Sequence, residues 1–256
     1  MSHPPIRSLA TLALLSTLLT GCDATAPPGP EAGLVIEAYL VWPGDAFVVD
    51  VSRPVPPGDV PEPIPEPGAR VAIGIGEEAP LLMTPDGQVP GRYTLPIDAL
   101  PLEDDTPYRL SVELDDQRLT AVTYVPIRPT NVQITPDVDT APLVLDRSED
   151  AFDDVLTLTW ALPEGNPTPH LIQVTHPDLG RTFNSAIRWD GEGTVERQAF
   201  PEDGVYELCL YRTTDDLVVY DQNRQARRLY VAPSNVEGGF GVFAALHGIC
   251  QPLTVR

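Results

Sequence analysis

Few side chains in this sequence have the types and spacing that chemistry requires. His170 and His176 lie six positions apart beside prolines, and His247 is distant from both in the sequence. A zinc site would use a tighter arrangement, and the His-Glu-x-x-His pattern does not occur. There is no Gly-x-Ser-x-Gly nucleophile motif, and no cysteine has a histidine in a recognisable catalytic setting. We therefore expect these histidines in loops or on sheet faces, and we predict no catalytic residue, no cofactor and no enzyme activity.

Carboxylates are the most abundant charged groups, with 37 aspartates and glutamates against 16 arginines and no lysine. Any two of them could be imagined as an acid/base pair, so such a pairing carries no information. One oxygen-rich cluster could hold calcium, which takes about 6–8 oxygen ligands, and could stiffen the junction it occupies. Its spacing is not that of an EF-hand, and a solvated acidic loop is the alternative. The cluster consists of Asp146, Glu149, Asp150, Asp153 and Asp154.

Cys209 and Cys250 are the two cysteines that remain when Cys22 is set aside. In an exported chain, an even number of remaining cysteines suggests a disulfide. The bond would close a loop of roughly 40 residues and stabilise the fold by about 3–4 kcal/mol on the chain-entropy model. A buried pair of free thiols is the alternative.

Cys22 follows a segment with the features of an export signal. Residues 1–21 contain one charge, Arg7, and an apolar run from Leu9 to Leu19 that is shorter than the ~20 residues of a membrane-spanning helix. Leu19-Thr20-Gly21-Cys22 matches the bacterial lipobox. The pattern predicts removal of residues 1–21 as a signal peptide and acylation of Cys22, so that lipid attaches the mature chain to the membrane. An ordinary signal peptide with a coincidental cysteine is the alternative.

The formal net charge of −21 excludes some classes of partner. Nucleic acid is bound by clustered cations, so we expect no nucleic-acid binding, and the same charge disfavours docking on anionic lipid. The absence of lysine has two compatible explanations. One is a GC-rich genome, and the other is life in salt, where a carboxylate-rich surface stays hydrated.

Short apolar runs and 30 prolines predict a fold made of strands, because proline removes a backbone donor and breaks helix interiors. The clearest hairpin runs from Tyr108 to Leu114 and returns from Leu119 to Val125. In its first strand, apolar residues alternate with Arg109, Ser111 and Glu113, so that one face of the strand is expected in the core and the other in solvent. Short strands repeated between turn signals over about 95 residues fit an immunoglobulin-like sandwich.

A second set of strands follows an acidic, turn-rich stretch. The segment VLTLTWALPEGNPTPHLIQVTHP resembles the opening hairpin of a fibronectin type III domain. Its Trp160 is expected in the core, with a carbohydrate-stacking platform as the alternative. One helix is predicted from Asp215 to Ala226, with acidic residues in its first turn and arginines near its end. The glycines from Gly238 to Gly241 predict a tight turn before a final strand, Val242 to Leu246, rather than a phosphate-binding loop.

We therefore predict an all-β protein with two tandem immunoglobulin/fibronectin III-like β-sandwich domains and one short helix. The predicted parts are a lipoprotein signal peptide at 1–21, a flexible tether at 22–32, an immunoglobulin-like sandwich at 33–128, an acidic linker at 129–153, and a fibronectin III-like sandwich at 154–256 that ends in the glycine-rich turn and a strand.

Several segments together resemble the Bacteroidota lipoproteins catalogued as domain of unknown function 4249. They are GLVIEAYLVWPGDAFVVDVSRPVP, PEPGARVAIGI, GRYTLPIDALPLEDDTPYRLSVELDDQRLTAVTYVPI, YELCLYRTTDDLVVYDQNRQA and SNVEGGFGVFAAL. They occur in the order of that family, behind the lipobox. The resemblance implies a cell-envelope lipoprotein of a kind often linked to TonB-dependent outer-membrane receptors. It supplies no catalytic residues.

The leading hypothesis from the sequence is a non-enzymatic binding or accessory module, anchored by lipid in the cell envelope at the outer membrane. Its expected partner is a TonB-dependent receptor. Two alternatives remain open. One is an envelope hydrolase or glycan-processing protein with a site of scattered carboxylates, and the other is a structural stalk stiffened by calcium. A deep pocket that gathers Asp or Glu beside a Trp would favour the hydrolase, whereas a flat or convex surface would favour the binding module.

Overall fold

The computed structural model describes residues 33–53, 63–103, 106–135, 143–145, 156–163, 167–176, 178, 180–185, 187–225 and 235–256. The chain divides into two units, Met1–Glu31 and Ala32–Arg256, and every element described below belongs to the second. Cys22 and the five acidic residues of the calcium hypothesis lie outside the described residues, so both hypotheses stay predictions.

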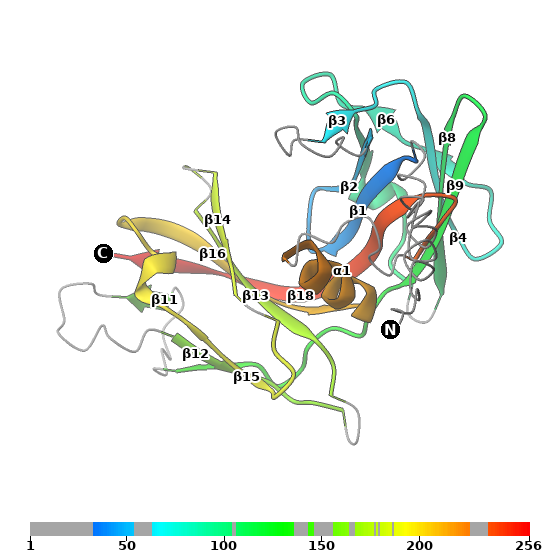
Figure 1. Ribbon diagram of the computed structural model, residues 1–256. Coiled ribbons are helices and arrows are strands. Elements are labelled where there is room, and N and C mark those ends of the chain that lie inside the picture. The colour runs from blue at the N-terminus through cyan, green and yellow to red at the C-terminus, as the bar shows by residue number, and fades with distance from the viewer. Residues whose placement is uncertain are drawn as a thin grey trace, which may run out of the picture. The chain divides into compact units, whose positions relative to one another are not determined.

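The first sandwich has two facing sheets (Figure 1). Its elements are β1 (Val35–Trp42), β2 (Ala46–Arg53), β3 (Ile64–Pro65), β4 (Arg70–Ile75), β5 (Leu81–Leu82), β6 (Thr84–Pro85), β7 (Arg92–Pro96), η1 (Ile97–Ala99), β8 (Pro107–Leu114), β9 (Gln117–Tyr124) and β17 (Val236–Glu237). One sheet contains β1, β2 and β7 in that order, with β6 beside β7 and β3 beside β2. The other has the order β17-β9-β8-β4-β5.

The core of this sandwich lies between the two sheets. Along β1 and β8, buried residues alternate with more exposed ones, as expected where only one face of a sheet is covered. Trp42 packs edge-on against Phe47 and Tyr108, with ring centroids 4.8 and 5.7 Å away. Aromatic pairs of this kind contribute about 0.5–1.5 kcal/mol beyond the area they bury. The hairpin predicted at residues 108–125 is confirmed as β8 and β9.

The second sandwich also has two sheets. Its elements are β10 (Gln133–Thr135), β11 (Leu143–Leu145), β12 (Leu156–Thr159), β13 (His170–His176), β14 (Arg181–Asn184), β15 (Glu192–Val195), η3 (Arg197–Ala199), β16 (Gly204–Thr213) and β18 (Phe240–Val255). One sheet has the order β10-β12-β15. The other, β14-β13-β16-β18 with β11 beside β18, continues from β18 into β1 and so forms one 10-stranded sheet with β1, β2, β3, β6 and β7 of the first sandwich. Their shared core includes Trp160, Ile172, Phe200 and Tyr206.

Strand β18 belongs to both sandwiches. Residues Phe240 to His247 pair in parallel with β1, and residues Leu246 to Val255 pair antiparallel with β16. Phe243 is therefore part of the first core and Leu253 part of the second. The sequence predicted only Val242 to Leu246 as a strand. The continuation was missed because Gly248 and Pro252 have low strand propensity, which the long pairing with β16 overrides.

Each sandwich has a tyrosine whose hydroxyl fastens a strand to the loop that precedes it. Tyr108 donates to the carbonyl of Pro101 at 2.7 Å and accepts from the amide of Glu103 at 2.9 Å. Tyr206 donates to the carbonyl of Glu202 at 2.7 Å. These are the tyrosine corners that are typical of immunoglobulin-like sandwiches. The predicted fold class, two tandem immunoglobulin/fibronectin III-like sandwiches, is confirmed.

The predicted helix is also present, as α1 (Asp215–Gln225). It lies across β18 (Figure 1), where Leu217 and Tyr220 pack against Val242, Ala244 and Tyr39. Among the described residues, no helix is long and apolar enough to cross a membrane.

The glycine-rich segment forms the predicted turn, and close packing explains its composition. Gly238 has a φ of +82° and Gly241 a φ of +113°, a region that side chains disfavour. A Cβ at Gly241 would lie 1.9 Å from the carbonyl oxygen of Ile36. The missing side chain therefore lets β18 lie directly against β1.

Candidate binding groove

A groove of about 500 Å³ crosses the outer face of β4, β8, β9 and β17, on the side of that sheet opposite the first core. The strand register brings its side chains into two adjacent rows of opposed residues. One row is Ser111-Thr120-Glu237, and the other is Gly74-Arg109-Val122.

The floor of the groove is formed by residues with small side chains, which leave space above the sheet. Gly74 comes from β4, Ser111 from β8 and Thr120 from β9. A Cβ added at Gly74 would lie 3.3 Å from the Cα of Pro80, so the turn between β4 and β5 folds closely over this position. The turn forms one end of the groove, and β17 forms the other.

The groove contains both hydrogen-bond donors and acceptors. Arg109 Nε donates to the carbonyl of Gly76 at 3.3 Å, which leaves further guanidinium N–H groups for a ligand. Thr120 Oγ1 donates to Glu237 Oε2 at 3.3 Å. Arg118 lies at the edge, with its Nε 3.9 Å from a Glu113 oxygen. An exposed ion pair at this distance contributes little, so Arg118 can turn to a ligand at small energetic cost.

The two carboxylates of the groove are too far apart to act as a hydrolytic pair. Glu78 belongs to the turn beside β4 and Glu237 to β17, with β8 and β9 between them. Four neighbouring strands span about 14 Å, whereas the carboxylates of glycosidases lie roughly 5–9.5 Å apart. The residues that line the groove include no tryptophan. The features that would favour the hydrolase alternative are therefore absent from this groove.

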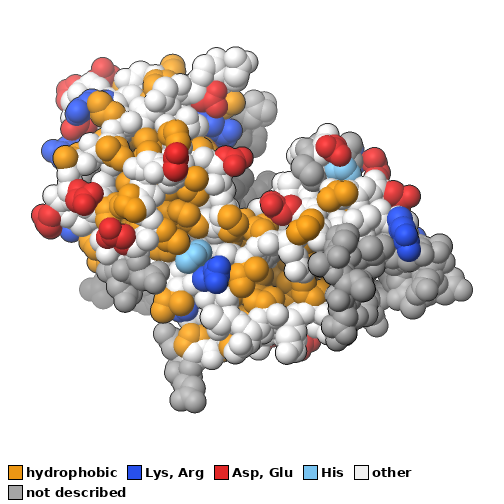
Figure 2. Space-filling model, turned by 180° about the vertical axis from the view of Figure 1, so that it is seen from behind, with side chains coloured by type: hydrophobic (Ala, Val, Ile, Leu, Met, Phe, Trp, Pro, Cys, Tyr) orange, Lys and Arg blue, Asp and Glu red, His pale blue; other side chains and the backbone are white. Residues whose placement is uncertain are grey.

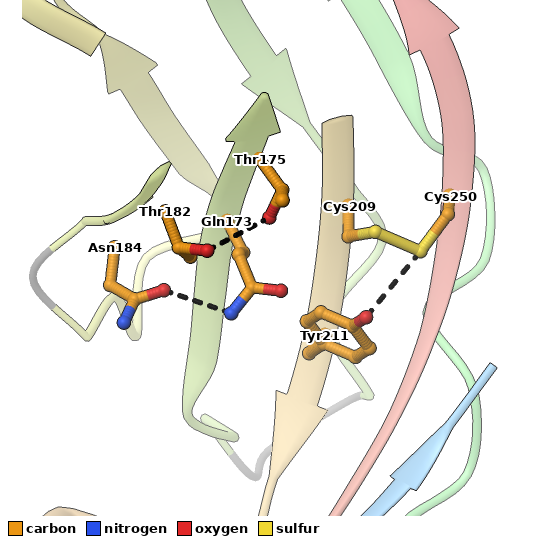
Figure 3. The surroundings of a disulfide bond; sticks show 7 residues. All are labelled: Gln173, Thr175, Thr182, Asn184, Cys209, Tyr211 and Cys250. Atoms are coloured by element: carbon orange, nitrogen blue, oxygen red, sulfur yellow. Dashed lines mark hydrogen bonds between the residues drawn. A yellow bond between two sulfur atoms is a disulfide. The ribbon is translucent and has the colours of Figure 1, made fainter. Parts of the chain in front are cut away.

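In the second sandwich, the disulfide lies on the face of β16 and β18 opposite the second core, where Cys209 is buried (Figure 3). Cys209 and Cys250 are directly opposed in the pairing of β16 with β18, and their sulfurs are bonded at 2.03 Å. The hydroxyl of Tyr211 lies 3.5 Å from the sulfur of Cys250. Burial, reinforced by the nearby carboxylate of Glu207, raises the pKa of Tyr211 to about 12, so this phenol stays protonated at neutral pH.

Polar pairs continue this outer face toward the edge of the sheet. Gln173 donates to Asn184 at 3.0 Å, and the hydroxyls of Thr175 and Thr182 are 3.3 Å apart (Figure 3). Their side chains hydrogen-bond to one another across β13 and β14. These pairs therefore stabilise the sheet.

Within the described residues, one group of three potential metal ligands has its atoms within 4.8 Å of one another: Glu207, Cys209 and Cys250. Both sulfurs are in the disulfide, and it is the thiolate that binds a metal. The group therefore offers a single carboxylate in this state.

The histidines are not grouped with other metal ligands in the described part of the chain. His170 is buried on β13, and its Nδ1 lies 2.8 Å from the carbonyl oxygen of Thr168. Burial lowers its pKa to about 4, and the charge of Arg212 acts in the same direction. His176 packs edge-on against Tyr206, with ring centroids 4.6 Å apart. Both side chains are thus core residues at opposite ends of one strand.

Trp160 is a core residue, as the first interpretation of the sequence predicted. It is 6% exposed, and its ring centroid is 4.9 Å from that of His170. The alternative, a carbohydrate-stacking platform, is wrong because the ring faces are covered within the second sandwich.

The residues of the groove were not selected from the sequence. Arg109 and Ser111 were recognised only as residues on the solvent-exposed face of a hairpin. Antiparallel sheets commonly have such a face, so it does not indicate a site. A signal was nevertheless present, because Arg118 and Thr120 follow the same alternation in the returning strand. What the sequence could not provide is the β4–β5 turn at one end and β17 at the other.

Apolar side chains are also exposed outside the groove. On the face in Figure 2, hydrophobic side chains occupy the middle and carboxylates lie mostly around them. Tyr124 and Ile127 are 54% and 57% exposed. Apolar atoms contribute more than half of the surface of an ordinary folded protein, so these side chains do not by themselves define a site.

No protein-family model matches this chain, and no curated protein is similar to it in sequence. Among solved structures, it is similar to a two-domain fibronectin type III segment of chicken tenascin, at 12% identity and a TM-score of 0.27, over 87% of this chain and 98% of that one. It is also similar to domains FN1–FN3 of chicken CNTN1, at 13% identity and a TM-score of 0.26, over 88% and 68% of the two chains. A titin segment is similar at 12% identity and a TM-score of 0.24, over 88% and 66%. The fold assignment rests on the strand pairing and the two cores.

Proposed function

We propose that this protein is a non-enzymatic binding module of the bacterial cell envelope, attached to the outer membrane by lipid at Cys22. It acts as an accessory to a TonB-dependent receptor, to which it presents a bound ligand. The single observation that carries the binding role is the groove on the outer face of β4, β8, β9 and β17. The lipid anchor and the receptor rest on the lipobox and on the family resemblance.

Two features of the groove support binding rather than catalysis. Its guanidinium and hydroxyl groups can hold a ligand by several hydrogen bonds without activating a nucleophile. Its carboxylates, Glu78 and Glu237, lie at opposite ends, where they cannot act on one bond together. A sandwich also suits this role, because rigid strands fix the positions of the side chains that contact the ligand.

The receptor association can be tested by affinity purification of the acylated chain from outer membranes, under detergent conditions that retain TonB-dependent receptors. We expect mass spectrometry to identify such a receptor in the eluate. The matched control is Cys22→Ser, which should be released from the membrane and should not recover the receptor. Recovery of the wild-type protein without any receptor would contradict the accessory role.

A further inference from the structure

The charges of the groove restrict the kind of ligand that it can accept. Arg109 and Arg118 supply donors, and Glu78 and Glu237 supply acceptors, so the lining is close to neutral. The chain as a whole has a formal net charge of −21 and repels an acidic polymer. This repulsion is screened beyond about 8 Å at physiological ionic strength. A small ligand with one anionic group can therefore reach the arginines, whereas a polyanion is disfavoured.

The floor of the groove carries hydroxyl groups that can bond to a ligand. Ser111 and Thr120 supply hydroxyls, and Val122 is the one sizeable apolar side chain in the two rows. Peptide and protein ligands are usually anchored by aromatic or aliphatic side chains in apolar pockets, which these rows do not provide. A sugar hydroxyl both donates and accepts, so it can bond to a carboxylate and to a guanidinium in the same groove.

The size of the groove agrees with a ligand of a few sugar rings. Its volume of about 500 Å³ is in the range of small-molecule sites. Its length across four strands is about 14 Å, which fits a disaccharide or a trisaccharide.

We infer that the groove binds a short oligosaccharide that carries a single carboxylate. Arg109 pairs with the carboxylate, because it lies in the middle of its row, between Gly74 and Val122. The sugar hydroxyls bond to Ser111, Thr120 and Glu237. This inference rests on the binding role proposed above and names the chemistry of the ligand.

Calorimetric titration of the full acylated chain tests this inference, in a detergent without a sugar headgroup. The two probes are lactobionate and lactitol, which differ only in that a carboxylate of the first is a hydroxymethyl group in the second. We expect one lactobionate per chain, and lactitol bound at least about ten-fold more weakly, because a charge-assisted hydrogen bond is lost. Equal affinity for the two probes, or no binding of either, would overturn the inference.

Two variants locate the site. Arg109→Ala should reduce the affinity for lactobionate to that for lactitol, and Ser111→Trp should abolish binding of both probes by filling the floor. The matched control is Arg70→Ala on the same sheet face, where Arg70 pairs with Glu113 at 3.2 Å outside the groove lining. An equal loss in this control would show that the general charge of the face, and not the groove, holds the ligand.

A third probe separates the sugar from an acidic peptide. Tetra-aspartate should bind more weakly than lactobionate, and tighter binding of the peptide would replace the inference with a peptide site. The outcomes are independent of the receptor experiment. Lactobionate binding without recovery of a receptor would support the ligand site and refute the accessory role. Recovery of a receptor without lactobionate binding would refute only the proposed ligand chemistry.

Discussion

Replacing both Cys209 and Cys250 by alanine should lower the free energy of unfolding by about 4 kcal/mol. The two residues are 41 positions apart in the sequence. On the chain-entropy model, a cross-link over this distance removes about 13 cal/mol/K of entropy from the unfolded chain, which corresponds to the stated value at 25 °C. The sulfurs also pack against Tyr211, so the loss of their contacts acts in the same direction.

The structure further predicts that this loss reaches both sandwiches. The disulfide fixes β18 against β16, and the first half of the same strand pairs with β1. Urea unfolding followed by tryptophan fluorescence can separate the two cores. Trp42 reports on the first core and Trp160 on the second. Each is measured in a variant in which the other core tryptophan and the exposed Trp189 are replaced by phenylalanine.

We expect the urea midpoint of both reporters to fall in the cysteine-free protein, with the larger change at Trp160. The oxidised wild type in the same backgrounds is the control. A change below about 1 kcal/mol at Trp160 would refute the entropy argument, since it would lie far under the expected value. A lower midpoint at Trp160 with an unchanged one at Trp42 would refute the coupling through β18.

Three single positions give further predictions. Gly241→Ala should prevent native folding, because a Cβ would lie 1.9 Å from the Ile36 carbonyl oxygen at a φ of +113°, and a wild-type melting temperature would contradict this. Tyr108→Phe should lower the free energy of unfolding by about 1–3 kcal/mol, measured in urea, because the Pro101 carbonyl loses its donor. The pKa of His170 is about 4 in the folded state, below its ordinary value of 6.5, so its contribution to stability is complete above pH 6.5 and is lost as the pH falls toward 4. The slope should reach about 1.4 kcal/mol per pH unit and disappear in His170→Gln; equal slopes in the two proteins would refute the assignment.

Local patterns in the sequence were sufficient for the individual elements. The alternation from Tyr108 to Leu114 identified β8, because a half-buried strand repeats every second residue. Acidic residues after Thr214 identified the start of α1, since they complement the helix dipole. The even number of cysteines left after Cys22 indicated the pair that is bonded in the structure. Each of these signals depends on neighbouring residues or on composition, which the chain carries without folding.

The sequence alone determined that this is an acidic chain of short strands with one helix, and that it contains a segment matching the lipobox pattern. Only the tertiary structure decided that β18 serves two sandwiches, that His170 is buried, and that Arg109 lies in a groove between a turn and β17. These features depend on which strands become neighbours. Strand neighbours in a sheet are distant in sequence, and the register that aligns their side chains is set by packing between sheets rather than by local propensity.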